Sequence, residues 1–307
     1  MKVIEGVVPV MLTPFTDDNE IDYPGLAQLI EWYVHKGVDA LFAVCQSSEM
    51  QHLSLAERVA LGHFVVEKTA GRVPVIVSGH ISDDIPAQIE ELQAMAHTGA
   101  DALVLVTNHL DPEDRGSEVF FSNLKQLLDA LPPTLPLGLY ECPAPYRRLL
   151  TDDEFAWCAN SGRFVVLKDV SCDLDTVTRR VALAKGTPLN IINANAAIAW
   201  PAIQAGSKGF SGVFTNFHPE LYVWLCHHHQ RDPALANELA TFLSLAAVSE
   251  TLGYPKNAKI YHQRLGTFTS DFCRVNKENV LEKFWGLDVI LDQIKQGSDF
   301  YLKKISK

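Results

Sequence analysis

The sequence predicts an α/β fold, a (β/α)8 TIM barrel with a C-terminal helical extension. Short apolar segments recur along the 307 residues, each bounded by turn residues and followed by a helix-like pattern. Strands that alternate with helices must pair in parallel, because each crossover returns the chain to the same end of the sheet. Eight such units favour closure into a barrel.

The eight candidate strands occupy the first three quarters of the chain. They begin near Val7, Ala40, Val73, Ala102, Leu135, Phe164, Leu189 and Gly209. No G-x-G-x-x-G turn follows the first of them, which argues against a doubly wound open sheet. After residue 225 the strand signal ends. We therefore expect a catalytic barrel at residues 1–225 and a helical extension, rather than a second catalytic domain, at residues 226–307.

Capping residues and apolar spacing indicate the helices. Asp22 is a candidate N-cap before an apolar helical face that ends at Gly37. Capping boxes begin two further helices at residues 54–57 and 151–154, and another apolar face runs from Ile85 towards Gly99. In the extension, helical patterns cover residues 232–253, residues 255–266 and the tail from residue 277.

Composition narrows the classes of partner. Hydrophobic residues make up 47% and charged residues 21%, a balance typical of a globular chain with a large core. The net charge of -11 repels phosphate backbones and anionic lipid, which argues against nucleic-acid or membrane binding. No segment approaches the ~18 apolar residues of a membrane span. The expected partners are small molecules or other protein chains.

Cysteine usage and the first residues favour a cytoplasmic protein. The six cysteines form no C-x-x-C pair, so we expect reduced thiols. The first twelve residues make a poor secretory segment, because Pro9 breaks a short apolar run. The cluster CHHH at residues 226–229 could bind a metal, but adjacent helical positions point to different faces, so a surface patch is the favoured interpretation.

In α/β barrels, function is located where strands end and loops begin. These positions carry Thr13, Ser47, Ser48, Glu49, Ser78, Thr107, Tyr140, Glu141, Lys168, Asn193, Asn195 and Ser211. Among them, we assign Asn195 and Ser211 to substrate binding. Lys168 and Tyr140 have the most informative chemistry.

Lys168 follows four apolar residues in FVVLKDVS (164–171), a stretch typical of a buried strand. An ammonium group in a dry barrel mouth loses hydration, which lowers its pKa and leaves a fraction as free amine. A free amine attacks ketones, and the resulting Schiff base is an electron sink through which a carbon–carbon bond can break or form. The alternative is a structural lysine paired with Glu141 or Asp169.

Tyr140 ends the preceding strand, LPLGLY (135–140), and parallel neighbours bring their carboxyl ends to the same mouth. Its phenol could transfer a proton to or from a substrate hydroxyl or the carbinolamine oxygen. The alternative is a core residue with its hydroxyl satisfied at the rim. The turn CQSSEM (45–50) could bind a carboxylate through backbone N–H groups, or be an ordinary polar loop.

Several motifs, in this order, resemble the dihydrodipicolinate synthase and N-acetylneuraminate lyase family. They are PxxxTPF (9–15), SSE (47–49), GRVPVI (71–76), LPLGLYECP (135–143), VVLKD (165–169) and GYPKNAKIYHQRLG (253–266). The resemblance covers nearly the whole chain. It implies a class I, Schiff-base aldolase on a (β/α)8 barrel with a helical extension, usually tetrameric, with no cofactor and no metal.

The resemblance also assigns roles to individual residues. Lys168 matches the lysine that forms an imine with pyruvate or another 2-oxo acid, and Tyr140 matches the tyrosine that transfers protons. Gln46 and Ser47 align with the family's Ser/Thr-Thr pair, which binds the carboxylate of the oxo acid and joins the proton relay. Ser47 keeps a hydroxyl and Gln46 does not, while Cys45 and Ser48 replace two glycines. We therefore assign catalysis to Ser47, and substrate binding to Gln46 and Ser48.

Departures from the family pattern bear on the substrate. The segment VTNHLDPED (106–114) lacks the tyrosine that, in the synthases, reaches into a neighbouring subunit's site. In YECPAPYRR (140–148), Glu141 replaces an asparagine and Arg147 only loosely matches the arginine that receives a second carboxylate; we assign both to substrate binding. Glu141 could instead be a base, or pair with Arg147 or Arg148. Residues 194–197 lack the Gly-x-Asp-Glu segment of the sialic acid lyases, which indicates a shorter or less hydroxylated substrate.

The favoured function is a carbon–carbon lyase that cleaves a 4-hydroxy-2-oxo acid reversibly into pyruvate and an aldehyde, and not a typical dihydrodipicolinate synthase. One alternative is dehydration of a 2-keto-3-deoxy acid through the same imine. The other is a catalytically inactive barrel that binds ligands or acts as a scaffold. We expect a homo-oligomer, a tetramer or a dimer.

Overall fold

The computed structural model describes residues 2–306 and contains an eight-stranded parallel sheet. Its strands are β1 (Gly6–Val7), β2 (Leu41–Ala43), β3 (Val75–Val77), β4 (Ala102–Val106), β5 (Leu137–Tyr140), β6 (Phe164–Asp169), β7 (Asn190–Asn193) and β8 (Gly209–Phe210). The strand order β1-β8-β7-β6-β5-β4-β3-β2 pairs successive strands and returns β8 to β1. The eight predicted strands are present, and the predicted barrel is confirmed.

Backbone contacts close the ring on both sides of β1. The N–H of Phe42 donates to the oxygen of Pro9 over 2.9 Å, and the N–H of Met11 donates to the oxygen of Phe42 over 3.0 Å. On the other side, Gly6 pairs with Gly209 so closely that a Cβ on Gly209 would lie 1.8 Å from the Gly6 oxygen. Closure at this point therefore requires glycine.

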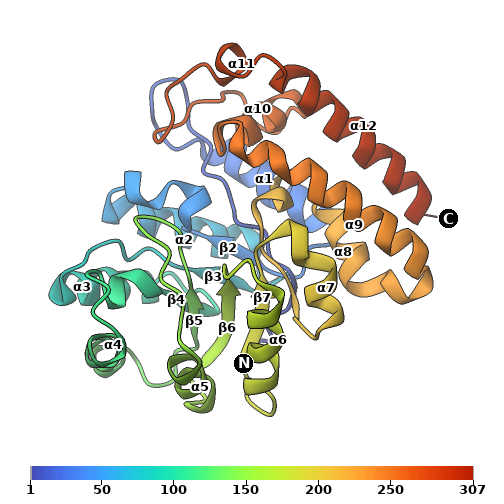
Figure 1. Cartoon of the computed structure of the whole chain (residues 1–307). Helices are drawn as coiled ribbons and strands as arrows, with labels where there is room; N and C mark the ends of the chain where they lie inside the picture. The colour runs from blue at the N-terminus through green and yellow to red at the C-terminus, as the bar shows by residue number, and fades with distance from the viewer. Residues whose placement is uncertain (1, 307) are drawn as a thin grey trace.

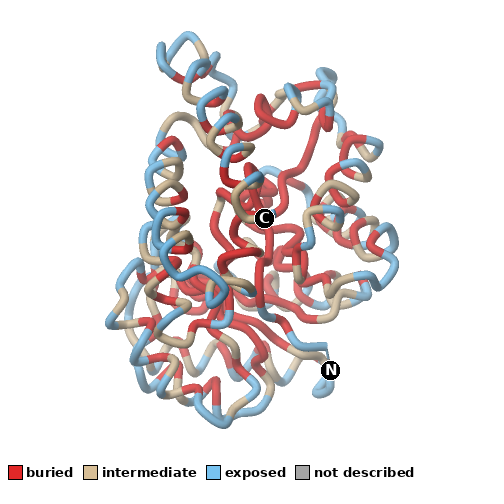
Figure 2. Tube along the Cα trace, turned by 90° about the vertical axis from the view of Figure 1, so that its right-hand side faces the viewer, coloured by how far each residue is buried: buried red, intermediate tan, exposed pale blue. Residues whose placement is uncertain are grey.

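Helices separate the strands and surround the barrel (Figure 1). They are α1 (Tyr23–His35), α2 (Leu55–Thr69), α3 (Ile85–Ala96), α4 (Ser117–Ala130), α5 (Asp152–Asn160), α6 (Leu174–Leu183), α7 (Ala199–Gln204) and α8 (Pro219–His228). Asp22 caps α1 as predicted, accepting from the N–H of Gly25 over 3.0 Å. The predicted capping boxes begin α2 and α5. Figure 2 shows buried residues along the strands and on the inward side of the helices.

The C-terminal extension is helical, as predicted. Its helices are α9 (Pro233–Ala247), α10 (Lys256–Arg264), α11 (Val280–Lys283) and α12 (Leu287–Ile305). In Figure 1 they lie together, in orange and red, beyond the carboxyl ends of the strands. The predicted boundary between residues 225 and 226 falls inside α8, so the barrel continues a few residues further than expected. Across residues 2–306, no helix combines the length and apolar character needed to span a membrane.

A buried ion pair joins the extension to the barrel. Lys259 on α10 bonds through Nζ to the Glu49 carboxylate, and both side chains are excluded from solvent. The same nitrogen donates to the oxygen of Phe272 over 2.9 Å, and the second Glu49 oxygen accepts from the N–H of Val275 over 2.8 Å. This ion pair therefore holds residues 259–275 against the turn that follows β2.

We expect Lys259→Met to lower the free energy of unfolding by about 3–5 kcal/mol, because the buried Glu49 carboxylate loses its charged partner. Urea unfolding monitored by circular dichroism measures the change. Lys295→Met breaks an exposed pair with Asp299 and is the control, with an expected cost of about 0.5 kcal/mol or less. Equal losses in the two variants would contradict a structural role for the buried pair.

Candidate active site

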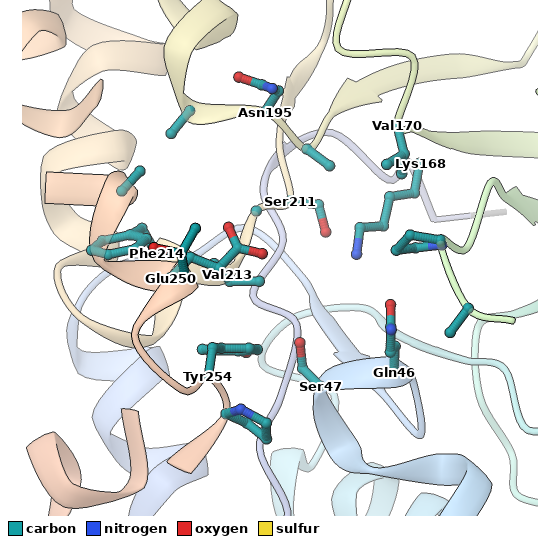
Figure 3. A pocket seen from close by; sticks show the side chains of 18 of the residues that line it. Gln46, Ser47, Lys168, Val170, Asn195, Ser211, Val213, Phe214, Glu250 and Tyr254 are labelled. Atoms are coloured by element: carbon teal, nitrogen blue, oxygen red, sulfur yellow. The ribbon is translucent and has the colours of Figure 1, made fainter. Parts of the chain in front are cut away.

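A cavity of about 1030 Å³ opens at the carboxyl ends of the strands, between the barrel and the extension (Figure 3). Its lining includes Gln46, Ser47, Tyr140, Lys168, Asn195, Ser211, Glu250 and Tyr254. The first six of these were predicted site residues. The structure therefore brings together residues that are up to 165 positions apart in the sequence, from Gln46 to Ser211.

Lys168 extends from the end of β6 into this cavity and is 8% exposed (Figure 3). Its burial lowers the pKa of the ammonium group below the ordinary lysine value, because loss of water disfavours the charged form. The Nζ atom lies 4.2 Å from the centre of the Tyr140 ring. None of the ion pairs among residues 2–306 includes Lys168.

The acidic residues next to Lys168 and Tyr140 in the sequence are bound elsewhere. Successive side chains of a strand face opposite sides, so Glu141 and Asp169 lie on the other side of the sheet from the amine. There, Arg180 of α6 donates to Glu141 Oε2 over 3.0 Å and also bonds to Asp169. The alternative of a structural Lys168 paired with Glu141 or Asp169 is therefore wrong.

Glu141 is completely buried in this network. Its Oε1 accepts from the N–H of Leu150 over 2.8 Å, and its Oε2 accepts from the N–H of Val170 over 3.1 Å. Desolvation raises the pKa of Glu141, against the opposing effect of the Arg180 charge. Glu141 forms its ion pair with Arg180, and the predicted pairing with Arg147 or Arg148 is wrong.

Tyr140 lies beside Lys168, because β5 and β6 pair with these two residues in register. Its hydroxyl donates to Gln46 Oε1 over 3.3 Å, and the Cys142 thiol donates to the same oxygen over 3.6 Å. Burial raises the pKa of Tyr140 well above that of a free phenol. The phenol is therefore held in its protonated form beside the amine.

The turn after β2 presents unused backbone donors to the cavity. Val44 has a φ of 52°, a left-handed conformation that is costly for a β-branched residue. The chain then enters the short 3-10 turn η1 (Gln46–Ser48). Among the described residues, the N–H groups of Gln46 and Ser47 have no hydrogen-bond acceptor. The turn can therefore bind an anion there.

Tyr254 contributes a second phenol, near Ser47 (Figure 3). Its hydroxyl accepts from Asn216 Nδ2 over 3.0 Å, and the Tyr33 hydroxyl bonds to Asn216 Oδ1. Burial raises the pKa of Tyr254 well above its ordinary value, against a smaller opposing effect of the nearby Ser47 hydroxyl. A chain of polar groups thus leads from Ser47 to Tyr33.

Glu250 enters the cavity from η7 (Val248–Thr251) and points in from the side opposite Lys168 (Figure 3). Glu250 is exposed through the mouth of the cavity, but neighbouring protein atoms partly desolvate its carboxyl group, which raises its pKa against the opposing effect of the Lys168 charge. We call the part of the cavity lined from residues 194–197, 213–214 and 244–251 the outer lobe.

Three residues predicted to bind substrate lie outside the cavity lining. Ser48 Oγ donates to the oxygen of Met11 over 2.7 Å and braces the turn. Arg147 is exposed and donates through Nη1 to backbone oxygens of residues 170–171 over 3.0 and 3.2 Å. Glu141 is bound in the Arg180 network. The side chains of these three residues make structural contacts and do not lie in the cavity as predicted.

Comparison of the sequence with models of known protein families agrees with the motifs and the cavity. The chain matches the model of the Dihydrodipicolinate synthetase family over residues 3–276. The chain belongs to this family. The predicted resemblance is thereby confirmed, and with it the enzyme class, a carbon–carbon lyase of the aldolase type.

Relatives within the family are distant in sequence and near in fold. The chain is 28% identical over 236 residues to the 4-hydroxy-tetrahydrodipicolinate synthase of Thioalkalivibrio sulfidiphilus, covering 77% of this chain and 78% of that protein. It superposes with a TM-score of 0.83 on dihydrodipicolinate synthase from Acinetobacter baumannii complexed with pyruvate, at 21% identity over 95% and 99% of the two chains. It also superposes on a prophage protein of the family from E. coli K12, again in complex with pyruvate, with a TM-score of 0.83. The identity is 24%, and the superposition covers 96% of this chain and 99% of the other.

Two cavity residues, Glu250 and Tyr254, were not predicted from the sequence. Tyr254 lies in the GYPKNAK segment that carries part of the family resemblance, but no strand ends there. Glu250 lies in the short polar stretch Ser249–Thr251, which interrupts an otherwise apolar helical pattern. That interruption was the available signal, although it does not indicate contact with the barrel mouth.

The contribution of Arg180 to stability can be measured by comparison with the adjacent Arg179. Arg180→Leu should lower the free energy of unfolding by about 3–5 kcal/mol at pH 7, since it leaves buried carboxylates unpaired. Arg179→Leu breaks only an exposed pair with Asp152 and should cost much less. Urea unfolding at pH 5 and 7 is the measurement. The Arg180→Leu deficit should narrow at pH 5, because protonation of Glu141 is favoured once Arg180 is gone; a deficit that widens at pH 5 would argue against this network.

Proposed function

We propose that this protein is a Schiff-base aldolase that cleaves or forms a carbon–carbon bond in a 4-hydroxy-2-oxo acid, with pyruvate as one component. The observation that carries the proposal is the Lys168 amine, which is buried in the cavity with a lowered pKa and no ion-pair partner among residues 2–306. A lysine in this state has a larger fraction of nucleophilic free amine at neutral pH than an exposed one.

The reaction begins with attack of Lys168 Nζ on the ketone carbon of pyruvate. Loss of water from the carbinolamine gives a protonated imine, and removal of a proton from the methyl carbon gives an enamine that attacks an aldehyde. Cleavage is the reverse sequence. Pyruvate is supported as the substrate by the two family members whose structures contain it.

Neighbouring groups have matching roles. The free N–H groups of Gln46 and Ser47 would bind the carboxylate of pyruvate. Tyr140, kept protonated by burial, would donate a proton to the departing carbinolamine oxygen and take it back in the reverse direction. Ser47, which lies near Tyr254, would extend this relay, and Ser211 and Asn195 complete the wall.

A typical dihydrodipicolinate synthase reaction is less well supported, although curated relatives carry that kind of name. The cavity lining drawn from residues 2–306 includes no arginine to receive a second carboxylate. The segment 106–114 contributes no side chain to this lining, and its His109 bonds to Asp83 over 2.8 Å. The proposed substrate therefore has one carboxylate, on the pyruvate half.

Two further expectations remain predictions. Dehydration of a 2-keto-3-deoxy acid would use the same imine, and product analysis separates it from cleavage. A homo-oligomer agrees with large apolar side chains exposed on the extension outside the cavity lining, namely Leu245, Trp285 and Val289.

The imine can be trapped directly. Borohydride added with pyruvate should attach one reduced pyruvate to the protein, and Lys168→Met should abolish the adduct because the nucleophile is gone. The rate of trapping should rise with pH, with a midpoint below the pKa of an ordinary lysine, since the free amine is the reactive form. Mass spectrometry of the intact and digested protein measures both.

Lys208→Met is the control for this experiment, because Lys208 is exposed before β8, away from the cavity. It should trap pyruvate as the unaltered protein does. Absence of an adduct with pyruvate and with other 2-oxo acids would support the inactive-scaffold alternative, and an adduct that survives Lys168→Met would place the nucleophile elsewhere.

Tyr140→Phe should lower kcat for aldol cleavage by about 100-fold or more, with a small change in KM, because it removes the proton donor and keeps the ring. Steady-state assays of aldehyde release measure this split. Tyr301→Phe, on α12 outside the cavity, is the matched control. Full activity of the Tyr140 variant would remove the proposed proton role.

A further inference from the structure

The chemistry of the outer lobe indicates which aldehyde the site accepts. This inference rests on the proposed aldolase function. We infer that the aldehyde half is neutral and largely apolar. It carries a hydroxyl group that donates to Glu250, and it carries no carboxylate. Glu250 would then be a specificity-determining residue.

The first argument is the chemistry of the wall. The outer lobe presents mainly small apolar side chains: Ala194, Ala196, Ala197, Val213, Phe214 and Ala247. Such a surface binds an apolar body by excluding water and provides few partners for a chain of hydroxyl groups. A polyol would leave its hydroxyl groups without hydrogen-bond partners there.

The second argument is that the neighbouring polar side chains already use their oxygen atoms in hydrogen bonds within the protein. Asn195 Oδ1 accepts from the N–H of Ala197 over 2.8 Å. Ser244 Oγ donates to the oxygen of Ala240 over 2.8 Å. The Glu250 carboxylate, in contrast, has no hydrogen-bond or ion-pair partner within the described part of the chain, and it points into the cavity (Figure 3). It is therefore free to accept a hydrogen bond from a ligand.

The third argument is the distribution of charge. The lysine and arginine side chains that line the cavity, considering residues 2–306, are Lys168, whose nitrogen is uncharged in the enamine that attacks the aldehyde, and Lys277, which is exposed beside the acidic Glu278. A carboxylate on the aldehyde would thus meet Glu250 in the outer lobe without an adjacent arginine or lysine. Like charges so placed oppose binding, and a site with this arrangement rejects anionic ligands.

Three aldehydes of one shape test the inference: benzaldehyde, 3-hydroxybenzaldehyde and 3-carboxybenzaldehyde, each condensed with pyruvate by the full-length protein. Pyruvate consumption gives kcat/KM for each aldehyde. We expect the hydroxyl compound to be the best substrate and the carboxylate to be at least about tenfold worse than benzaldehyde. Glu250→Gln should shrink this carboxylate penalty by about tenfold and reduce the preference for the hydroxyl compound.

Glu238→Gln, an exposed glutamate on α9 paired with Lys304, is the control and should keep the unaltered order. Three outcomes would overturn this inference and leave the proposed function standing. They are a preference for the carboxylate compound, a kcat/KM ratio between the carboxylate compound and benzaldehyde that Glu250→Gln does not change, and failure of all three aldehydes while borohydride still traps pyruvate. Absence of trapping in the unaltered protein would instead overturn the proposed function, and this inference with it.

Discussion

The site depends on the alternation of side chains along two neighbouring strands. Tyr140 and Lys168 face the cavity because they are paired in register at the ends of β5 and β6. The residue that follows each of them in the sequence is acidic and faces the opposite side, where Arg180 binds both carboxylates. The amine is therefore separated from the two nearest acids in the sequence, and burial lowers its pKa against smaller opposing effects that include the charge of Glu250.

The helical extension makes that burial possible. An open barrel mouth would leave Lys168 hydrated, whereas side chains from segments 244–255 and 275–278 of the extension line the cavity together with the strand ends. The extension is held in place by the buried Glu49–Lys259 pair, whose carboxylate belongs to the same turn that presents Gln46 and Ser47. One turn therefore binds the extension and, in the proposed reaction, the substrate carboxylate. The exclusion of water from the cavity and the position of its anion site thus depend on the same turn.

The sequence was informative where structure is determined locally. Capping at Asp22 and the eight apolar segments were sufficient for the elements and their order, because caps and strand periods are local signals. Partners were harder to predict. Arg180 lies 39 positions from Glu141, and the nearer Arg147 and Arg148 were better candidates by sequence distance alone. Which loop of the extension reaches the strand ends is set by helix packing, and no periodic pattern contains that information.

The two halves of the cavity are built from different parts of the fold, which is shared with solved structures at low sequence identity. The proposed nucleophile, Lys168, and the phenol of Tyr140 lie on paired strands, whose register cannot shift by one residue without turning Lys168 away from the cavity. The outer lobe is built from turns and from the extension, where a side chain such as Glu250 can change without disturbing a strand pair. In the proposed reaction, imine chemistry is thus confined to the half of the cavity built from paired strands. Selection of the second component belongs to the half that tolerates substitution, and Glu250 lies there.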